Sequence, residues 1–425
     1  METKISNEEQ SESTQQTQQP ISPPDTKISW VICAGAFFCM LLSQGTGNSF
    51  GIYQVYYKEN FLKSSKASSI SWIGTIATAM MLFSGIFASR LAISIGFRNT
   101  CWIGGVLGFV GLFAASFCSS VGALIATQGV IFGIGIGFVY STAISVVSMW
   151  FEKYRGAALG IITAGSGIGG IVMSRIITAI LNNLGFRWAL RITSFMFVGI
   201  ILAVSIPFKS RIDLKASPQK LVDFKALKSP IFVSVLLCGF IGNLGYIVPV
   251  FFPPAAIAQL GASSSKSSFL VTLFNIGFLI GSVVNGKLSD NLGPLNIFGA
   301  SAFLCGLYQI VLWVGINTIN SISATTFLYG FSVSGFILVC IGAIGKYSPK
   351  EKIPSYNGLY LSFNGISLIC GNFLVTLFLD TLGKGTKFTY VVIFSSACMI
   401  VGSFFIIFAI FYVRRHSEGP PSWKN

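Results

Sequence analysis

Long apolar runs follow one another along this 425-residue chain, and each is long enough to cross a lipid bilayer. A membrane-spanning helix needs about 20 predominantly apolar residues. Hydrophobic residues make up 53% of the chain and charged residues only 10%, which excludes a soluble globular protein. We therefore predict an all-α, polytopic membrane protein with twelve transmembrane helices, the seventh ending at Pro253. The predicted spans are residues 29–53, 69–88, 100–117, 121–147, 157–181, 188–208, 231–252, 268–288, 295–316, 322–344, 356–379 and 388–413.

The distribution of charge predicts the orientation and the domains. Residues 1–28 are polar and rich in Gln, Ser, Glu and Pro, which is typical of a disordered tail. Cytosolic loops hold the excess of Lys and Arg, so both termini are predicted to be cytosolic. The loop at 209–230 divides the chain into six-helix bundles at 29–208 and 231–413, and a cytosolic tail follows at 414–425. A basic face beside anionic lipid explains the net charge of +15, so no nucleic-acid partner is predicted.

A short basic turn with Lys153 and Arg155 leads directly into a glycine-rich apolar run. From Gly156 onward, small residues that include Gly165 and Gly167 leave one predicted helix with little side-chain bulk. Another helix backbone can then approach closely, which is how helices associate in lipid. The turn and the run after it are interpreted as a transporter hinge. A simple packing face of small residues is the alternative.

The same turn resembles a family signature. Residues 151–167 read aromatic-x-Lys-x-Arg-Gly, then Ala-Leu-Gly and Ala-Gly-Ser-Gly, which resembles the loop between spans four and five of monocarboxylate porters of the major facilitator superfamily. Residues 48–57 (NSFGIYQVYY), 69–74 (SISWIG) and 185–192 (GFRWALRI) resemble the fungal branch. The resemblance is close over the first half and looser over the second. It implies two six-helix bundles that alternate access to a site near the bilayer midplane.

A second motif lies between the predicted spans eight and nine. Residues 286–294 (GKLSDNLGP) resemble the loop motif of the superfamily, which implies that Asp290 holds neighbouring helix ends together on the cytosolic side, with Gly293 in the turn. The corresponding stretch of the first half, residues 89–98, has Gly96 in place but Ile93 where the Asp usually stands. The two halves are therefore predicted to echo each other incompletely.

Acidic residues are missing from the middle of every predicted span. Proton-coupled carriers usually keep a carboxylate or a histidine within the membrane, and the single histidine, His416, lies in the tail. The nine cysteines have no metal-like spacing, and no phosphate-binding loop of the G-x-x-x-x-G-K-[ST] type occurs. No cofactor, metal, catalytic residue or enzymatic activity is predicted. Proton symport and facilitated diffusion both remain open.

Polar groups inside the spans are the candidate substrate-binding residues. Arg175 offers a guanidinium that can bind a carboxylate through two hydrogen bonds. Its depth of about 28 Å, however, also fits an arginine that reaches the outer interface. The uncharged candidates expected in a central cavity are Asn48, Tyr140, Asn275 and Asn364, for which interhelical hydrogen bonding is the alternative. Further polar residues considered for this cavity are Tyr53, Gln54, Ser141, Asn243, Tyr246 and Tyr360.

The predicted function is secondary transport of a small organic solute, with a monocarboxylate as one candidate. The lysine of animal lactate carriers falls on Asn48 here, and their span-eight Asp and Arg fall near Phe278 and Ser282. A permease for a larger molecule such as riboflavin is therefore an alternative, as is a membrane sensor or scaffold that transports nothing. Bilayer lipid is the other expected partner, and a monomer is expected to suffice. The plasma membrane is expected from the resemblance, with the vacuolar and endoplasmic reticulum membranes open.

Overall fold

The computed structural model describes residues 23–63, 67–211, 224–262, 264–382 and 387–416, and these residues are almost entirely helical. Most of the tail predicted at 1–28 lies outside the described residues, as do the middle of the 209–230 loop and the end of the 414–425 tail. The long helices are α2 (Lys27–Asn48), α4 (Ala67–Phe83), α5 (Gly85–Ile95), α6 (Phe97–Ala115), α8 (Phe132–Trp150), α9 (Arg155–Val204), α10 (Pro230–Gly245), α13 (Ser264–Leu292), α14 (Pro294–Tyr308), α15 (Ile319–Tyr347), α16 (Ile353–Thr381) and α17 (Thr389–His416).

The described chain crosses the membrane twelve times. Nine of its helices are long and apolar enough to span a bilayer. The 50-residue α9 contains two spans joined at Gly185, while α4 and α5 form one span bent by 42°. The 16-residue α10 is shorter and is continued by α11 (Ile247–Phe251) and α12 (Pro253–Gln259). The predicted all-α polytopic fold is confirmed.

One local expectation was wrong. Residues 182–187 do not form a loop between two helices, because one residue, Gly185 (φ 79°, ψ 173°), is the only break in α9. Glycine adopts this positive φ without steric cost. Pro253, predicted to close the seventh span, follows the end of α11 at Phe251 and begins the separate short helix α12. Proline is tolerated there because the first turn of a helix leaves its N–H groups unpaired in any case.

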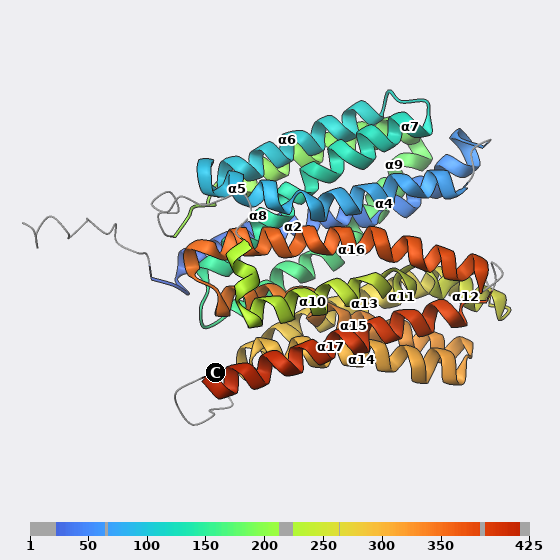
Figure 1. Ribbon diagram of the computed structural model, residues 1–425. Helices are drawn as coiled ribbons and strands as arrows, with labels where there is room; N and C mark the ends of the chain where they lie inside the picture. The colour runs from blue at the N-terminus through green and yellow to red at the C-terminus, as the bar shows by residue number, and fades with distance from the viewer. Residues whose placement is uncertain (1–22, 64–66, 212–223, 263, 383–386, 417–425) are drawn as a thin grey trace, which may run out of the picture.

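The helices form two halves that lie side by side (Figure 1). The first half, α2 to α9, occupies the upper part of the view and the second half, α10 to α17, the lower part, with α16 along the boundary. Within each half, α2 packs along the first span of α9, and α13 packs along α15. Between the halves, α9 packs on α13, and α16 packs on α4 and α5. α2 and α9 approach closely at Gly45 and Gly169, where a Cβ atom on either glycine would clash with the backbone of the other helix.

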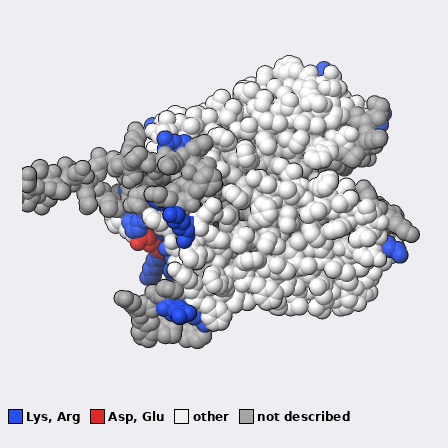
Figure 2. All heavy atoms as spheres, viewed as in Figure 1, with Lys and Arg blue, Asp and Glu red and all other residues white. Residues whose placement is uncertain are grey.

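Most of the visible Lys and Arg residues gather at one end of the molecule (Figure 2). We call it the basic end; it contains the turn between α8 and α9, the turn between α13 and α14, and the carboxyl end of α17. Gly96 and Gly293 form matching turns here, with φ of 91° and 90°, each between two helices of one half. In Figure 2 the outline is notched between the halves at the opposite end.

Candidate functional site

The two halves are joined at the basic end by one carboxylate. Asp290, near the end of α13, accepts hydrogen bonds from the backbone N–H groups of Gly156 (2.6 Å) and Ala157 (2.8 Å) at the start of α9. The first N–H groups of a helix have no partner within it, and the helix dipole favours a negative charge there. Asp290 of the second half therefore caps a helix of the first half.

Glycines make this contact possible. A Cβ atom on Gly156 would meet the carbonyl oxygen of Gly286, and one on Gly160 would meet the carbonyl oxygen of Ser282. Farther from the basic end, a Cβ atom on Gly167 would lie at an ordinary 3.6 Å from Leu279. The seam between α9 and α13 is thus tightest at the basic end and looser toward the opposite end.

An ion pair lies beside this cap. Glu152, in the turn before α9, contacts Lys350 of the second half at 2.6 Å and Arg211 of the first half at 2.9 Å. The hydrogen bonds from Lys350 and Arg211 lower the pKa of Glu152 to about 2. Glu152 therefore remains ionised under physiological conditions and adds a second link between the halves.

The same turn is bound from its own half by Asp25. This carboxylate accepts hydrogen bonds from the backbone N–H groups of Glu152, Lys153 and Tyr154, at 3.0 to 3.3 Å. Arg155 fixes the other side of the turn, since its Nε donates to the carbonyl oxygens of Ser148 and Phe151. The turn predicted as a hinge is thus held rigidly within the first half.

The halves meet in a second place, where α16 packs on α4 and α5. The Ser362 hydroxyl donates to the carbonyl oxygen of Phe83 at 2.9 Å, and Gly358 packs directly on Ser89. The neighbouring Asn357 is fully buried, and neither its amide nitrogen nor its amide oxygen has a hydrogen-bond partner. A buried unpaired polar group costs about 1–3 kcal/mol. The first turns of α16, beside this contact, therefore include an unfavourable element.

A cluster of uncharged polar residues lies where the halves meet in the middle of the membrane. In the second half, the Asn243 amide of α10 donates to Asn364 Oδ1 of α16 at 3.0 Å. The Tyr360 hydroxyl lies within hydrogen-bonding reach of Asn364 and of Cys340 in α15. Tyr140 of α8 faces them from the first half, close enough to Cys340 to interact electrostatically. We call Tyr140, Asn243, Cys340, Tyr360 and Asn364 the central cluster.

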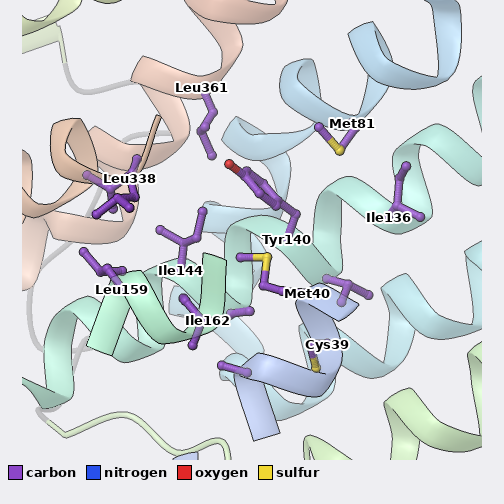
Figure 3. Close-up of a cluster of buried hydrophobic side chains, with 14 of the residues drawn as sticks. Cys39, Met40, Met81, Ile136, Tyr140, Ile144, Leu159, Ile162, Leu338 and Leu361 are labelled. Carbon is purple, nitrogen blue, oxygen red and sulfur yellow. The ribbon is translucent and has the colours of Figure 1, made fainter. Parts of the chain in front are cut away.

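Figure 3 shows the surroundings of Tyr140. Its ring lies among apolar side chains of both halves, such as Met81 and Leu361, and its hydroxyl points toward the side of Leu361. Tyr140 is ten residues from the end of α8 and Asn364 eleven residues from the start of α16, which places both about 15 Å from the basic end. This is about half the thickness of the hydrocarbon core.

The other candidate binding residues lie elsewhere. Arg175 is exposed on α9, about 30 Å from the basic end, and Asn48 is exposed at the end of α2 at a similar depth. Their neighbours Ser174 and Ser49 contact each other at 3.1 Å, so Asn48 and Arg175 belong to one region near the opposite end. Asn275 lies at intermediate depth on α13, and its amide donates to the Val271 carbonyl of its own helix. The structure therefore does not bring all five together.

The glycines and cations predicted for the hinge lie in different parts of the structure. Gly165 packs within the first half, where a Cβ atom would lie 2.7 Å from the carbonyl oxygen of Phe37. Gly167 faces the second half, and Gly293 forms the turn that begins α14. Lys153 is exposed and lies over the ring of Tyr154.

Residues that reasoning from the sequence missed are Asp25, Lys350 and Asn357. Asp25 was assigned to the tail, and its positive φ of 57° becomes visible only in the structure. Lys350 contacts Glu152, 198 positions away, and the lack of a partner for the Asn357 amide depends on how α16 is packed, so a single sequence carries no signal for either residue.

The described carboxylates lie away from the central cluster. Among the carboxylates whose side chains the structure describes, Asp25, Glu152 and Asp290 all lie at the basic end. Within the described residues, no group of three or more His, Cys, Asp or Glu side chains could hold a metal ion. The central cluster therefore presents hydrogen-bonding groups and aromatic rings rather than charges.

Two helical halves around a polar cluster at the middle of the membrane define a membrane transporter. The sequence matches the family model of the Major Facilitator Superfamily over residues 32–253 and 235–425, and the chain belongs to this superfamily.

Fungal relatives and solved structures agree with this assignment. The chain is 28% identical over 395 residues to the MFS transporter asaE of Aspergillus flavus, covering 92% of this chain and 89% of that protein. It is 29% identical over 377 residues to the aspyridones efflux protein apdF of Emericella nidulans, covering 88% and 76%. Its fold is similar to that of the E. coli fucose:proton symporter FucP (TM-score 0.70, 13% identity, 90% and 98% covered). The human organic anion transporter MFSD10 is similar as well (TM-score 0.69, 11% identity, 91% and 100% covered).

Proposed function

We propose that this chain is a secondary transporter for an organic molecule that is uncharged or weakly polar and larger than a monocarboxylate. The observation that carries the proposal is the composition of the central cluster, in which amides, phenols and a thiol meet without a charged side chain. Amide groups both donate and accept hydrogen bonds, and phenol rings add apolar contact area. Such a surface suits an oxygenated aromatic or polycyclic solute.

A monocarboxylate is less well matched to this cluster. A carboxylate removed from water needs a cation or several aligned N–H groups. Arg175, the candidate cation, lies about 15 Å farther from the basic end than Tyr140 and is exposed. The experiment below therefore tests a monocarboxylate as the competing substrate.

Export is the direction that the relatives favour. One relative is described as an aspyridones efflux protein, another as an agnestins efflux protein from Paecilomyces divaricatus (26% identical over 390 residues). We propose that the basic end faces the cytosol, since cytosolic loops collect Lys and Arg. In this proposal the solute enters from the basic end and leaves at the opposite end.

The contacts between the two halves also support transport by alternating access. The contacts of Asp290 and Glu152 tie the halves together at the basic end, and the contact of Ser362 joins them nearer the middle of the membrane. The looser packing at Gly167 and the notch in Figure 2 support a state in which the central cluster is reached from the opposite end. Transport then requires the basic-end contacts to break while contacts form at the other end.

The test is transport by the purified full-length protein in sealed vesicles, with labelled riboflavin as a larger neutral probe and labelled pyruvate as a monocarboxylate. We expect saturable movement of the larger probe and none of pyruvate. Asn364→Leu should reduce the apparent affinity for the larger probe about tenfold, because one hydrogen bond to a buried group is lost. Asn296→Leu is the matched control, since Asn296 is exposed at the basic end and its amide donates to the carbonyl oxygen of Leu292 at the end of α13, away from the central cluster.

The results of this assay distinguish a carrier of a larger solute from a monocarboxylate carrier and from a scaffold. Transport of pyruvate that is unaffected by Asn364→Leu would overturn the proposal in favour of a monocarboxylate carrier with a site elsewhere. Neither transport nor binding of any compound in a panel of neutral aromatic molecules would favour a scaffold with the same fold. Repeating the assay with an imposed proton gradient distinguishes symport or antiport from facilitated diffusion.

A further inference from the structure

A groove lies on the lipid-facing side of the second half, between α10 and α17. Its volume is about 740 Å³, and its walls are mostly apolar, with Val233 and Leu237 on α10 facing Phe404 and Phe408 on α17. Phe404 and Phe408 are 58% and 60% exposed, so their rings are directed into the bilayer. None of the central-cluster residues lines the groove, and the proposed transport cycle does not use it.

The groove has a closed end and a charged mouth. Toward the middle of the membrane it ends where α10 and α17 touch, at Cys238 and Gly402. At the basic end it reaches the exposed Lys228, just before α10 begins. From Lys228 to Leu237 it extends for about 14 Å, which matches one leaflet of a hydrocarbon core about 30 Å thick.

A second cation lies on the same wall as the phenylalanines. Arg415 follows Phe408 by seven residues, which places it on the same face of α17 and about 10 Å closer to the basic end. Arg415 is exposed. The segments that form the mouth, α10, α17 and Phe224–Lys228, contain no Asp or Glu that would neutralise these cations.

We propose that this groove is a binding site for an anionic phospholipid of the leaflet at the basic end. One acyl chain packs between α10 and α17 against Phe404 and Phe408, and the phosphate group lies at Lys228 and Arg415. An acyl chain fits because the groove is apolar and one leaflet deep. An anionic headgroup is favoured because the described residues of the mouth include these two cations and no carboxylate.

The experiment is native mass spectrometry of the full-length protein after equilibration with equal amounts of phosphatidylglycerol and phosphatidylcholine that carry the same acyl chains. The wild type is expected to retain one phosphatidylglycerol in preference to phosphatidylcholine. Lys228→Gln should reduce this preference about fivefold, the loss expected for one cation near the membrane surface. Lys287→Gln removes an equally exposed cation from the basic end away from the groove and should leave the preference unchanged.

Filling the groove tests the acyl chain separately. Val233→Trp should remove the retained lipid, whereas Ile393→Trp, at a lipid-exposed position of α17 outside the groove, should not. Equal retention of the two lipids by the wild type would overturn the proposal, and so would equal losses in Lys228→Gln and Lys287→Gln. If Val233→Trp does not fold, the double variant Lys228→Gln/Arg415→Gln decides, with about a 25-fold loss of preference expected. No transported solute is needed, so failure here leaves the proposed function untouched.

Discussion

The carboxylate of Asp290 lies 2.6 Å from the backbone nitrogen of Gly156, so that a residue of the second half caps a helix of the first half. This bond exists only while the halves meet at the basic end. It is also one-sided, because Ile93 occupies the corresponding position of the first half. We propose that Asp290 stabilises the state that is closed at the basic end.

Asp290→Ala should open this end. Loss of two hydrogen bonds and of a charge at a helix start is expected to destabilise the closed state by about 1–2 kcal/mol. The fraction open at the basic end should then rise about tenfold. The measurement is the rate of thiol labelling of Ser148→Cys, a fully buried position that faces Gly345 of the second half, relative to the parent with its native cysteines.

Asp25→Ala is the control for this prediction. Asp25 binds the same turn, but only from within the first half. Its loss should leave the labelling rate close to that of the parent. Equal increases for Asp25→Ala and Asp290→Ala would mean that the turn itself, rather than the link between halves, controls access.

Leucine substitutions at two glycines of α9 should have different effects. Gly160→Leu places a side chain against Ser282 of the second half, and Gly165→Leu places one against Phe37 of the first half. Overpacking a tight contact costs about 1–3 kcal/mol. Gly160→Leu should therefore raise thiol labelling of Ser148→Cys, while Gly165→Leu should lower the thermal unfolding temperature. The prediction fails if both variants change the same one of these two readouts.

Asn357→Leu should favour the closed state. It removes a buried amide with no partner and keeps a similar volume, which is expected to stabilise the contact by about 1–3 kcal/mol. Thermal stability should rise, and both transport and labelling of Ser148→Cys should slow. Asn285→Leu is the contrasting variant: its amide donates to Phe331 and Ser334, so its loss should lower stability. Faster transport by Asn357→Leu would contradict the prediction.

Acid should weaken the Glu152 link. The pKa of Glu152 is lowered to about 2 in the folded protein, below the usual value of about 4.3. Its stabilising contribution is therefore complete above about pH 4.3 and is lost as the pH falls toward 2. The effect should be small, since the side chain is 37% exposed. The midpoint temperature of thermal unfolding, measured from pH 7 to pH 2, should fall more steeply for the wild type than for Glu152→Gln. Parallel curves for the two proteins would refute this.

The fold could be predicted because each span is long, apolar and bounded by polar residues. These are local properties of the chain. The position of Asp290 at the end of its helix also followed from a local motif. Its partner Gly156, 134 residues away, depends on how the halves pack.

The candidate site was less accessible to prediction. Tyr140 and Asn364 meet others in the central cluster, whereas Asn48 and Arg175 lie near the opposite end. All four are polar residues in apolar runs, and the sequence does not reveal that the first two are level with each other. Depth depends on where each helix begins, and a shift of a few residues moves a side chain by several ångströms.

Gly185 joins two membrane spans with a single residue in place of a loop. Because no loop residues separate the two spans, the span before Gly185 determines which face of the following span is turned toward the protein interior. Inserting one residue after Gly185 would turn the following helix by about 100° and move its buried face, which includes Phe197 and Ile201, toward lipid. In the proposed transport cycle we therefore expect the fifth and sixth spans to move together.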